Sequence, residues 1–250
     1  MDIELWDMQC GFGGATPGDP SVAKADELVA EMQRVGIARA VVRTAPEDLD
    51  CDVLASNAAL YAACSEHSAL LPCPVVVPST GGDLPPEAEQ LQGHLRRGCA
   101  AVSIRPGRDH WRLAPWNSDA LFRVLATHRV PALINGEQVG LEQIAELAAR
   151  YPELPIVVIG MAYREHRALA ALLQAFPRVH LGLGGACAVH GALEHLAATV
   201  GAERVLFGTG FPVSEPMAAI TYLMYADLST EQKALIGSGN AQRLLAEVRR

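Results

Sequence analysis

The sequence has little charge and no excess of basic residues. Charged side chains make up 19% of the 250 residues, and the net charge is −8. Binding to nucleic acid or to an anionic membrane surface would need a basic patch, so neither partner is expected. The sequence also lacks an apolar run of about 18 residues and a cleavable leader, which predicts a cytoplasmic protein.

Paired cysteines and clustered histidines are missing as well. The six cysteines lie far apart with no CxxC pair, and no HxH, HxxH or HExxH motif occurs. Reduced, mostly buried thiols are therefore expected rather than disulfides or a zinc site. No GxSxG or Walker pattern occurs, and residues 11–16, GFGGAT, hold Thr16 at the third glycine position of a dinucleotide fingerprint.

The sequence does contain a regular alternation of short apolar runs and amphipathic stretches. Eight such units predict a closed parallel (β/α)8 TIM barrel of the α/β class, and an open doubly wound sheet is the alternative. The length suits a single domain over 1–250 with an extra C-terminal helix. The predicted strands lie within 3–8, 38–44, 70–78, 100–104, 131–135, 155–159, 179–183 and 205–207. The predicted helices lie within 20–35, 51–67, 86–97, 117–127, 141–150, 164–176, 189–200, 214–225 and 229–248.

The most informative motif is residues 204–212, RVLFGTGFP, which reads as a short buried strand followed by a turn. It resembles the last-strand motif of the amidohydrolase-2 (amidohydrolase-related) family, a group of metal-dependent TIM-barrel hydrolases and decarboxylases. PELPIVVIG at 152–160 and GNAQRLL at 239–245 resemble segments of the same family. The resemblance implies an active site at the C-terminal mouth of the barrel.

The resemblance also implies five metal ligands, and this sequence carries none of them. The HxH pair after strand one falls on Gln9 and Gly11, the histidines after strands five and six fall on Asn135 and Gly160, and the aspartate falls on Gly210. Glycine offers no side-chain donor, and amides are poor ligands for zinc-like ions. We therefore expect a site with no metal and no other cofactor.

Two arginines stand at the ends of predicted strands. Arg43 ends strand two and Arg105 ends strand four, where a guanidinium can bind a carboxylate through two parallel hydrogen bonds. Arg105 is the first candidate for the site, and its alternative role is a rim ion pair with Asp109 or another acid. Asn135 could bind a carbonyl or stabilise an oxyanion, with Gln9 in support.

Proton transfer needs a further group. His190, in the loop after strand seven, could be a neutral acid–base group, or a histidine that faces solvent at a helix start. Glu137 could be a general base or a solvated loop acid. Tyr163 and Glu215 follow strands six and eight and complete the polar candidates.

These observations favour a metal-independent hydrolase, lyase (decarboxylase) or cyclase that acts on a small carboxylated or carbonyl compound, with an anionic substrate expected. The alternative is a non-catalytic pseudoenzyme that binds a ligand or regulates a partner. A mouth plugged by Trp116, Met161 or Phe211 would favour that alternative, and a homodimer is one assembly open to such a barrel. The predicted catalytic residues are Arg105, Asn135 and His190, and the predicted substrate-binding residues are Gln9, Arg43, Glu137, Tyr163 and Glu215.

Overall fold

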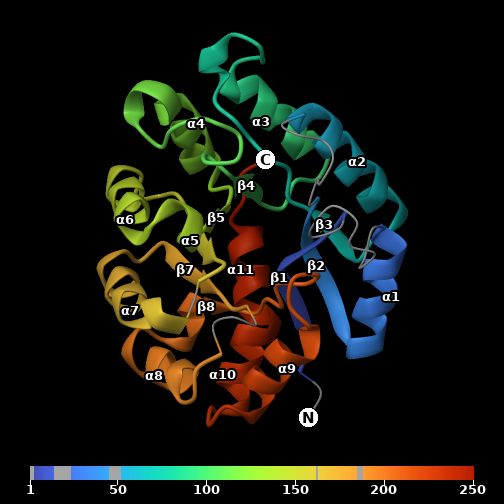
Figure 1. Ribbon diagram of the computed structural model, residues 1–250, viewed down its shortest axis with the longest axis vertical. Coiled ribbons are helices and arrows are strands. Elements are labelled where there is room, and N and C mark those ends of the chain that lie inside the picture. The colour runs from blue at the N-terminus through green and yellow to red at the C-terminus, as the bar shows by residue number, and fades with distance from the viewer. Residues whose placement is uncertain (1–2, 14–23, 45–51, 162, 185–187) are drawn as a thin grey trace.

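The computed structural model describes residues 3–13, 24–44, 52–161, 163–184 and 188–250. Strands and helices alternate along the chain, as predicted (Figure 1). The strands are β1 (Leu5–Phe12), β2 (Ile37–Thr44), β3 (Leu70–Pro72), β4 (Val102–Ile104), β5 (Ala132–Asn135), β6 (Ile156–Ile159), β7 (Val179–Gly182) and β8 (Val205–Leu206). The α-helices are α1 (Ala25–Val35), α2 (Val53–Glu66), α3 (Glu87–Arg96), α4 (Pro115–His128), α5 (Gly136–Val139), α6 (Leu141–Arg150), α7 (His166–Ala175), α8 (Ala192–Thr199), α9 (Pro216–Tyr225), α10 (Thr230–Ala234) and α11 (Asn240–Ala246).

The strands close into a barrel through two seams. Parallel pairing runs in the order β1-β2-β3 and β4-β5-β6-β7-β8. A parallel bridge between Val75 and Ser103 joins the β3 and β4 sides. On the other seam the Met8 amide donates to the Phe207 carbonyl at 2.9 Å, beside β1 and β8. Both sheet edges are therefore paired, and the predicted (β/α)8 barrel is confirmed.

Apolar side chains on the two faces of the strands fill two layers. Val42 and Ile134 are buried between the strands and the surrounding helices. Their neighbours Val41 and Leu133 pack inside the barrel, where Leu244 of α11 joins them. This is the side-chain alternation that a strand buried on both faces requires. Helix α11 lies across the centre of the ring of helices and covers one end of the barrel interior (Figure 1).

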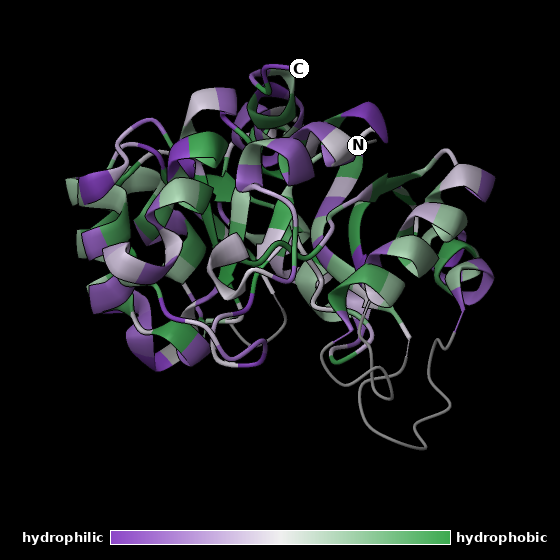
Figure 2. Ribbon diagram, turned by 90° about the horizontal axis from the view of Figure 1, so that it is seen from above, coloured by the Kyte–Doolittle hydropathy of each residue, from purple (hydrophilic) through white to green (hydrophobic). Residues whose placement is uncertain are grey.

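Hydrophobic residues gather on the strands and on the helix faces turned toward them, whereas hydrophilic residues lie mainly on the outer turns (Figure 2). Within the described ranges, every helix is too short or too polar to cross a lipid bilayer.

Two helices differ from the prediction. Helix α4 begins at Pro115 rather than at Asn117, because proline fits the first helical turn and fixes its backbone. The Asn117 side chain instead accepts from the Arg112 amide and donates to Thr80 Oγ1, each at 2.7 Å, and so braces two loops. The helix expected over 229–248 is α10 and α11, joined by a π-helical turn at Leu235–Gly239.

Candidate functional site

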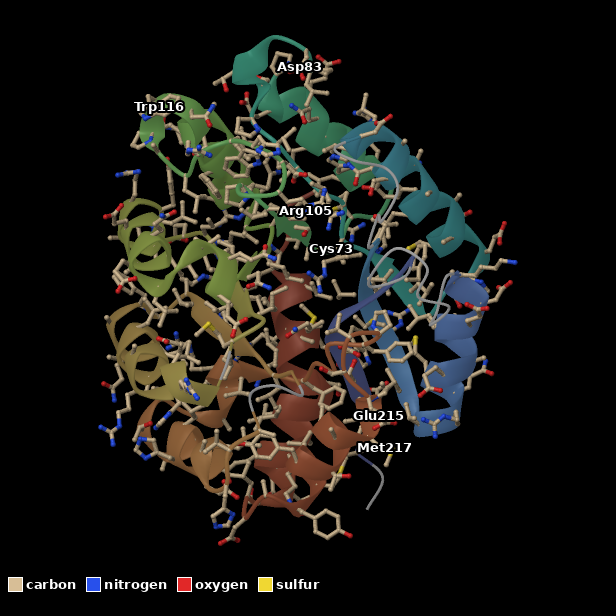
Figure 3. All side chains as sticks on the ribbon, in the orientation of Figure 1. Cys73, Asp83, Arg105, Trp116, Glu215 and Met217 are labelled. Carbon is tan, nitrogen blue, oxygen red and sulfur yellow. The ribbon has the colours of Figure 1, made fainter. Side chains whose placement is uncertain are left out.

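A cavity of about 450 Å³ opens at the carboxyl ends of the strands, where barrel enzymes hold their active sites. Met161 and Phe211 line this cavity without filling it, and Trp116 lies outside it with 76% of its surface exposed. Arg105 lies near the centre of the ring of helices and Trp116 at its edge (Figure 3). The described residues therefore form an open mouth. Its charged and amide side chains include Gln9, Arg43, Arg105, Arg108, Asn135 and Glu137.

Arg105 is both a wall of the cavity and one half of a buried ion pair. Its Nε donates to Asp109 Oδ2 at 3.1 Å, and its Nη2 donates to Asp109 Oδ1 at 2.9 Å. The Asp109 side chain is 3% exposed and that of Arg105 is 14% exposed. The ion pair considered as the alternative role for Arg105 is therefore present, and it orients the guanidinium at the cavity wall.

Arg43 and Gln9 bring polar atoms without partners to the same cavity. The Nε of Arg43 and the Oε1 of Gln9 are buried and have no hydrogen-bond partner among the described residues. A buried donor or acceptor left unpaired costs about 1–3 kcal/mol. A ligand that accepts from Arg43 and donates to Gln9 would satisfy both atoms, because both residues line the cavity.

Asn135 and Gly160 share one space. The Asn135 Oδ1 accepts from the Gln138 amide at 3.1 Å and caps α5, which leaves its Nδ2 to donate to a ligand. A Cβ on Gly160 would lie 2.4 Å from that Nδ2, and Gly160 has a φ of +64°. The amide at 135 therefore occupies the place that a side chain at 160 would need.

The five positions at which the resemblance implies metal ligands do not fit a metal centre. A Cβ on Gly11 would lie 2.6 Å from the backbone oxygen of Arg43, so strand β2 fills the space of a side chain there. The two amides, Gln9 and Asn135, suit zinc-like ions poorly. Within the ranges that the structure describes, no group of three or more His, Cys, Asp or Glu side chains could hold an ion.

Gly11→Ala is expected to lower the free energy of unfolding by about 2 kcal/mol, because the added methyl meets backbone rather than a movable side chain. The midpoint of urea unfolding measures the loss. Gly93→Ala in α3 is the matched control, since nothing lies within 4 Å of its Cβ position. That variant should gain about 0.5–1 kcal/mol, because alanine favours a helix. Equal effects of the two substitutions would contradict the close approach of β1 and β2.

A buried carboxylate fixes the strand ends beneath the cavity. Asp7, 1% exposed, accepts from the Gln9 amide at 2.8 Å, the Thr209 amide at 3.1 Å and Thr209 Oγ1 at 2.5 Å. Burial raises the pKa of Asp7 above its ordinary value, although these hydrogen bonds and the charge of Arg43 act to lower it. A bulge between Asp7 and Cys10 breaks the regular side-chain alternation of β1, so Met8 packs inside the barrel while Gln9 lines the cavity.

Asp7→Asn is expected to change how stability depends on pH. A carboxyl with a raised folded pKa stabilises the fold fully below its unfolded pKa, near 3.8, and loses that contribution as the pH rises through the folded pKa. The wild type should therefore exceed Asp7→Asn in free energy of unfolding by an amount that grows as the pH falls from neutral toward 4. Urea midpoints across this range measure it, with the exposed Asp227→Asn as control. A constant or shrinking advantage would contradict the raised pKa.

Two predicted site residues, His190 and Glu215, are not part of this cavity, and the side chain of a third, Tyr163, is not described. His190 lines a separate depression with Tyr225. Glu215 is 59% exposed and lies 3.3 Å from the Nη2 of Arg34 in a surface ion pair. Tyr163 begins a short 3₁₀ turn, and its side chain lies outside the described atoms. The structure brings together Gln9, Arg43, Arg105, Asn135 and Glu137.

Other residues of the cavity were not predicted from the sequence. Ser103 of β4 precedes Arg105, which directly follows the strand, by two residues and therefore faces the same way, a signal that strand alternation offers. Arg108 and Ser214 lie in loops after β4 and β8, and the same cavity includes them. Loop conformation decides their positions, so no periodic pattern could have indicated them.

Comparisons with known proteins match this architecture. The model of the family described as Amidohydrolase matches residues 6–246. Among proteins of curated function, none matches the sequence.

Solved structures of similar fold cover nearly the whole chain. 5-Carboxyvanillate decarboxylase from Novosphingobium aromaticivorans, complexed with manganese, has a TM-score of 0.77 and 16% identity over 98% of this chain and 96% of that chain. 2,6-Dihydroxybenzoate decarboxylase from Rhizobium has a TM-score of 0.72 and 15% identity over 98% of this chain and 99% of that chain. A TIM-barrel protein from Bordetella bronchiseptica has a TM-score of 0.72 and 16% identity over 98% of this chain and 99% of that chain. At these identities the likeness shows the fold.

Proposed function

Because the chain belongs to the amidohydrolase family, we propose that it is an enzyme that acts without a bound metal on a small carboxylated compound. The reaction would be of hydrolase, decarboxylase or cyclase type. The observation that carries the proposal is the cavity of about 450 Å³, where guanidinium and amide groups converge and the family's metal-ligand positions hold no suitable donors.

The cavity residues have complementary parts in this proposal. Arg43 and Arg105 bind the substrate carboxylate, since both guanidiniums line the cavity. Asn135 Nδ2 donates to a carbonyl or to the oxyanion that develops from it, because its Oδ1 is already bonded to the Gln138 amide. Glu137 supplies the one carboxylate among the described lining residues, and it moves the proton.

The comparisons support a carboxylated substrate. Two of the solved structures are named as decarboxylases of carboxylated aromatic compounds. One of these is named as a manganese complex, whereas the residues at the corresponding motif positions of this chain fit a metal poorly. Protein groups would then supply the electrostatic stabilisation of developing charge, and Asn135 and the two arginines are the groups in place to do so.

The first experiment measures metal content and turnover together. Protein purified without chelator is analysed by inductively coupled plasma mass spectrometry. It is then screened by thermal shift against aromatic and aliphatic carboxylates, and each binding compound is assayed for hydrolysis and for release of carbon dioxide. We expect much less than one metal ion per chain, a rise in melting temperature that increases with carboxylate concentration, and turnover that persists in EDTA.

Three results would count against the proposal, each in a different way. Near-stoichiometric metal with turnover lost in EDTA would indicate a metal-dependent enzyme. Saturable binding of a carboxylate with no turnover of any binding compound would indicate a non-catalytic member of the family. Absence of carboxylate binding would contradict the assignment of Arg43 and Arg105.

A further inference from the structure

A second set of unpartnered polar atoms lies at the amino ends of the strands, away from the cavity. His180, the second residue of β7, is 5% exposed, and neither of its ring nitrogens has a partner among the described residues. Burial, followed by the charges of Arg204, Arg178 and Arg243, lowers the pKa of His180 to about 3. The imidazole is therefore neutral at pH 7 and carries one N–H. We refer to these four residues as the floor cluster.

Hydrogen bonds fix two of the arginines from one side. Arg204 Nη2 donates to the Phe176 carbonyl at 2.7 Å and to the Val179 carbonyl. Arg243 Nη2 donates to the Glu203 carbonyl at 2.9 Å. These contacts hold the Arg204 guanidinium beside the start of β7 and the Arg243 guanidinium of α11 beside the start of β8, which limits the freedom of the cluster to rearrange.

The remaining donors of the cluster are left without acceptors. Arg178 Nη1 lies 2.6 Å from the Glu247 carboxylate, but its Nε and Nη2 are buried and unbonded within the described part of the chain. The Nε of Arg204 is also buried and has no hydrogen-bond partner within the described part of the chain. Together with the His180 N–H, these donors at the starts of β7 and β8 need acceptors, at a cost of about 1–3 kcal/mol for each buried donor left unpaired.

Charge is also unbalanced at this place. Glu247 is paired with Arg178, and Glu203 is the acid that acts on Arg204. Burial, the largest effect, and the charge of Arg243 nevertheless lower the pKa of Arg204. Three guanidiniums thus face two carboxylates. A water molecule could accept hydrogen bonds here, but an anion would also offset the excess charge.

We propose that the floor cluster binds a small inorganic anion of about the size of chloride, held by the free N–H groups of Arg178 and Arg204 and by the His180 imidazole. The close packing around His180 favours a compact anion over a larger oxyanion. The site is independent of the cavity at the mouth and of the function proposed for it. It would stabilise the barrel where β7, β8 and α11 meet.

The position of the anion is tested by crystallography. Crystals of the full chain are soaked in sodium bromide, and anomalous scattering locates the bromide. We expect a peak within hydrogen-bond distance of the Arg204 Nε and a ring nitrogen of His180. Bromide peaks at other places with none at the floor cluster would overturn the proposal.

Thermal unfolding tests the same site in solution. Replacing sodium gluconate by sodium chloride at constant ionic strength should raise the melting temperature of the wild type by about 4 °C at a chloride concentration about ten times the Kd, and the stabilisation should follow ln(1 + c/Kd), where c is the chloride concentration. Arg178→Met should abolish most of this rise, and His180→Phe gives a second test that keeps every arginine. Arg34→Met, an exposed arginine, and Arg43→Met at the mouth should both keep the rise. Loss of the rise in Arg43→Met alone would place the anion in the cavity and overturn the proposal. Equal melting temperatures of the wild type in the two salts would also overturn it.

Discussion

Arg105→Met should lower the free energy of unfolding by about 4 kcal/mol. Methionine keeps much of the apolar length of the side chain but leaves the Asp109 carboxylate, 3% exposed, without its cation. Removing one partner of a buried ion pair costs about 3–5 kcal/mol, because the remaining charge stays buried and uncompensated. Urea unfolding followed by circular dichroism measures the loss as a fall in the midpoint.

The double variant Arg105→Met with Asp109→Leu separates the ion pair from other effects at the same place. It removes both charges and fills the space with apolar groups, so it should recover most of the lost stability. A fall in the free energy of unfolding of less than about 1 kcal/mol in the single variant would match that of an exposed ion pair. It would show that the pair does not hold the loop after β4. Failure of the double variant to recover would show that Arg105 stabilises the barrel in another way.

Arg43→Met is expected to weaken carboxylate binding about 100-fold with little change in stability. Arg43 has no ion pair within the described residues, and its buried Nε lacks a partner, so its guanidinium is available to a ligand. A charge-assisted hydrogen bond to a carboxylate contributes about 1.5–3 kcal/mol. Isothermal titration calorimetry with a carboxylate found in the thermal-shift screen measures the change.

Arg39→Met provides the matched control for this prediction. Arg39 lies on the same strand, but its guanidinium stacks over the Trp6 ring, 5.1 Å from the centroid, and does not line the cavity. The two variants lose the same charge. An equal loss of affinity in both would show that net charge attracts the ligand and would contradict a contact with Arg43. Unchanged affinity in Arg43→Met would also contradict a contact between Arg43 and the ligand.

Short-range patterns predicted most of the fold. The helix over Leu141–Arg150 is as expected, and a capping box at Ser229 begins the helix predicted there, because helix periodicity and capping depend on residues three or four positions apart. The predicted start of α4 at Asn117 was wrong, because an asparagine near a helix start resembles an N-cap residue. Pro115 determines that start through its fixed backbone angle.

The site was only partly predictable. Arg43 and Arg105 end strands, and all parallel strands end at the same face of a barrel, so both were expected at the mouth. The place of His190 depends on the turn at Gly191, where φ is +72°, and no periodic pattern encodes that turn. The crowding at Gly11 arises from the backbone of β2, whose close approach depends on a register that the sequence does not display.

The bond between Asp7 and Thr209 joins residues 202 positions apart. Contacts of such long range form late, because the entropy of closing the loop must be overcome before they contribute. During synthesis on the ribosome, β1 emerges first and waits with an unpaired edge until β8 has been made. Premature termination before β8 would leave that edge open to other chains, so completion of the barrel is also its protection from aggregation.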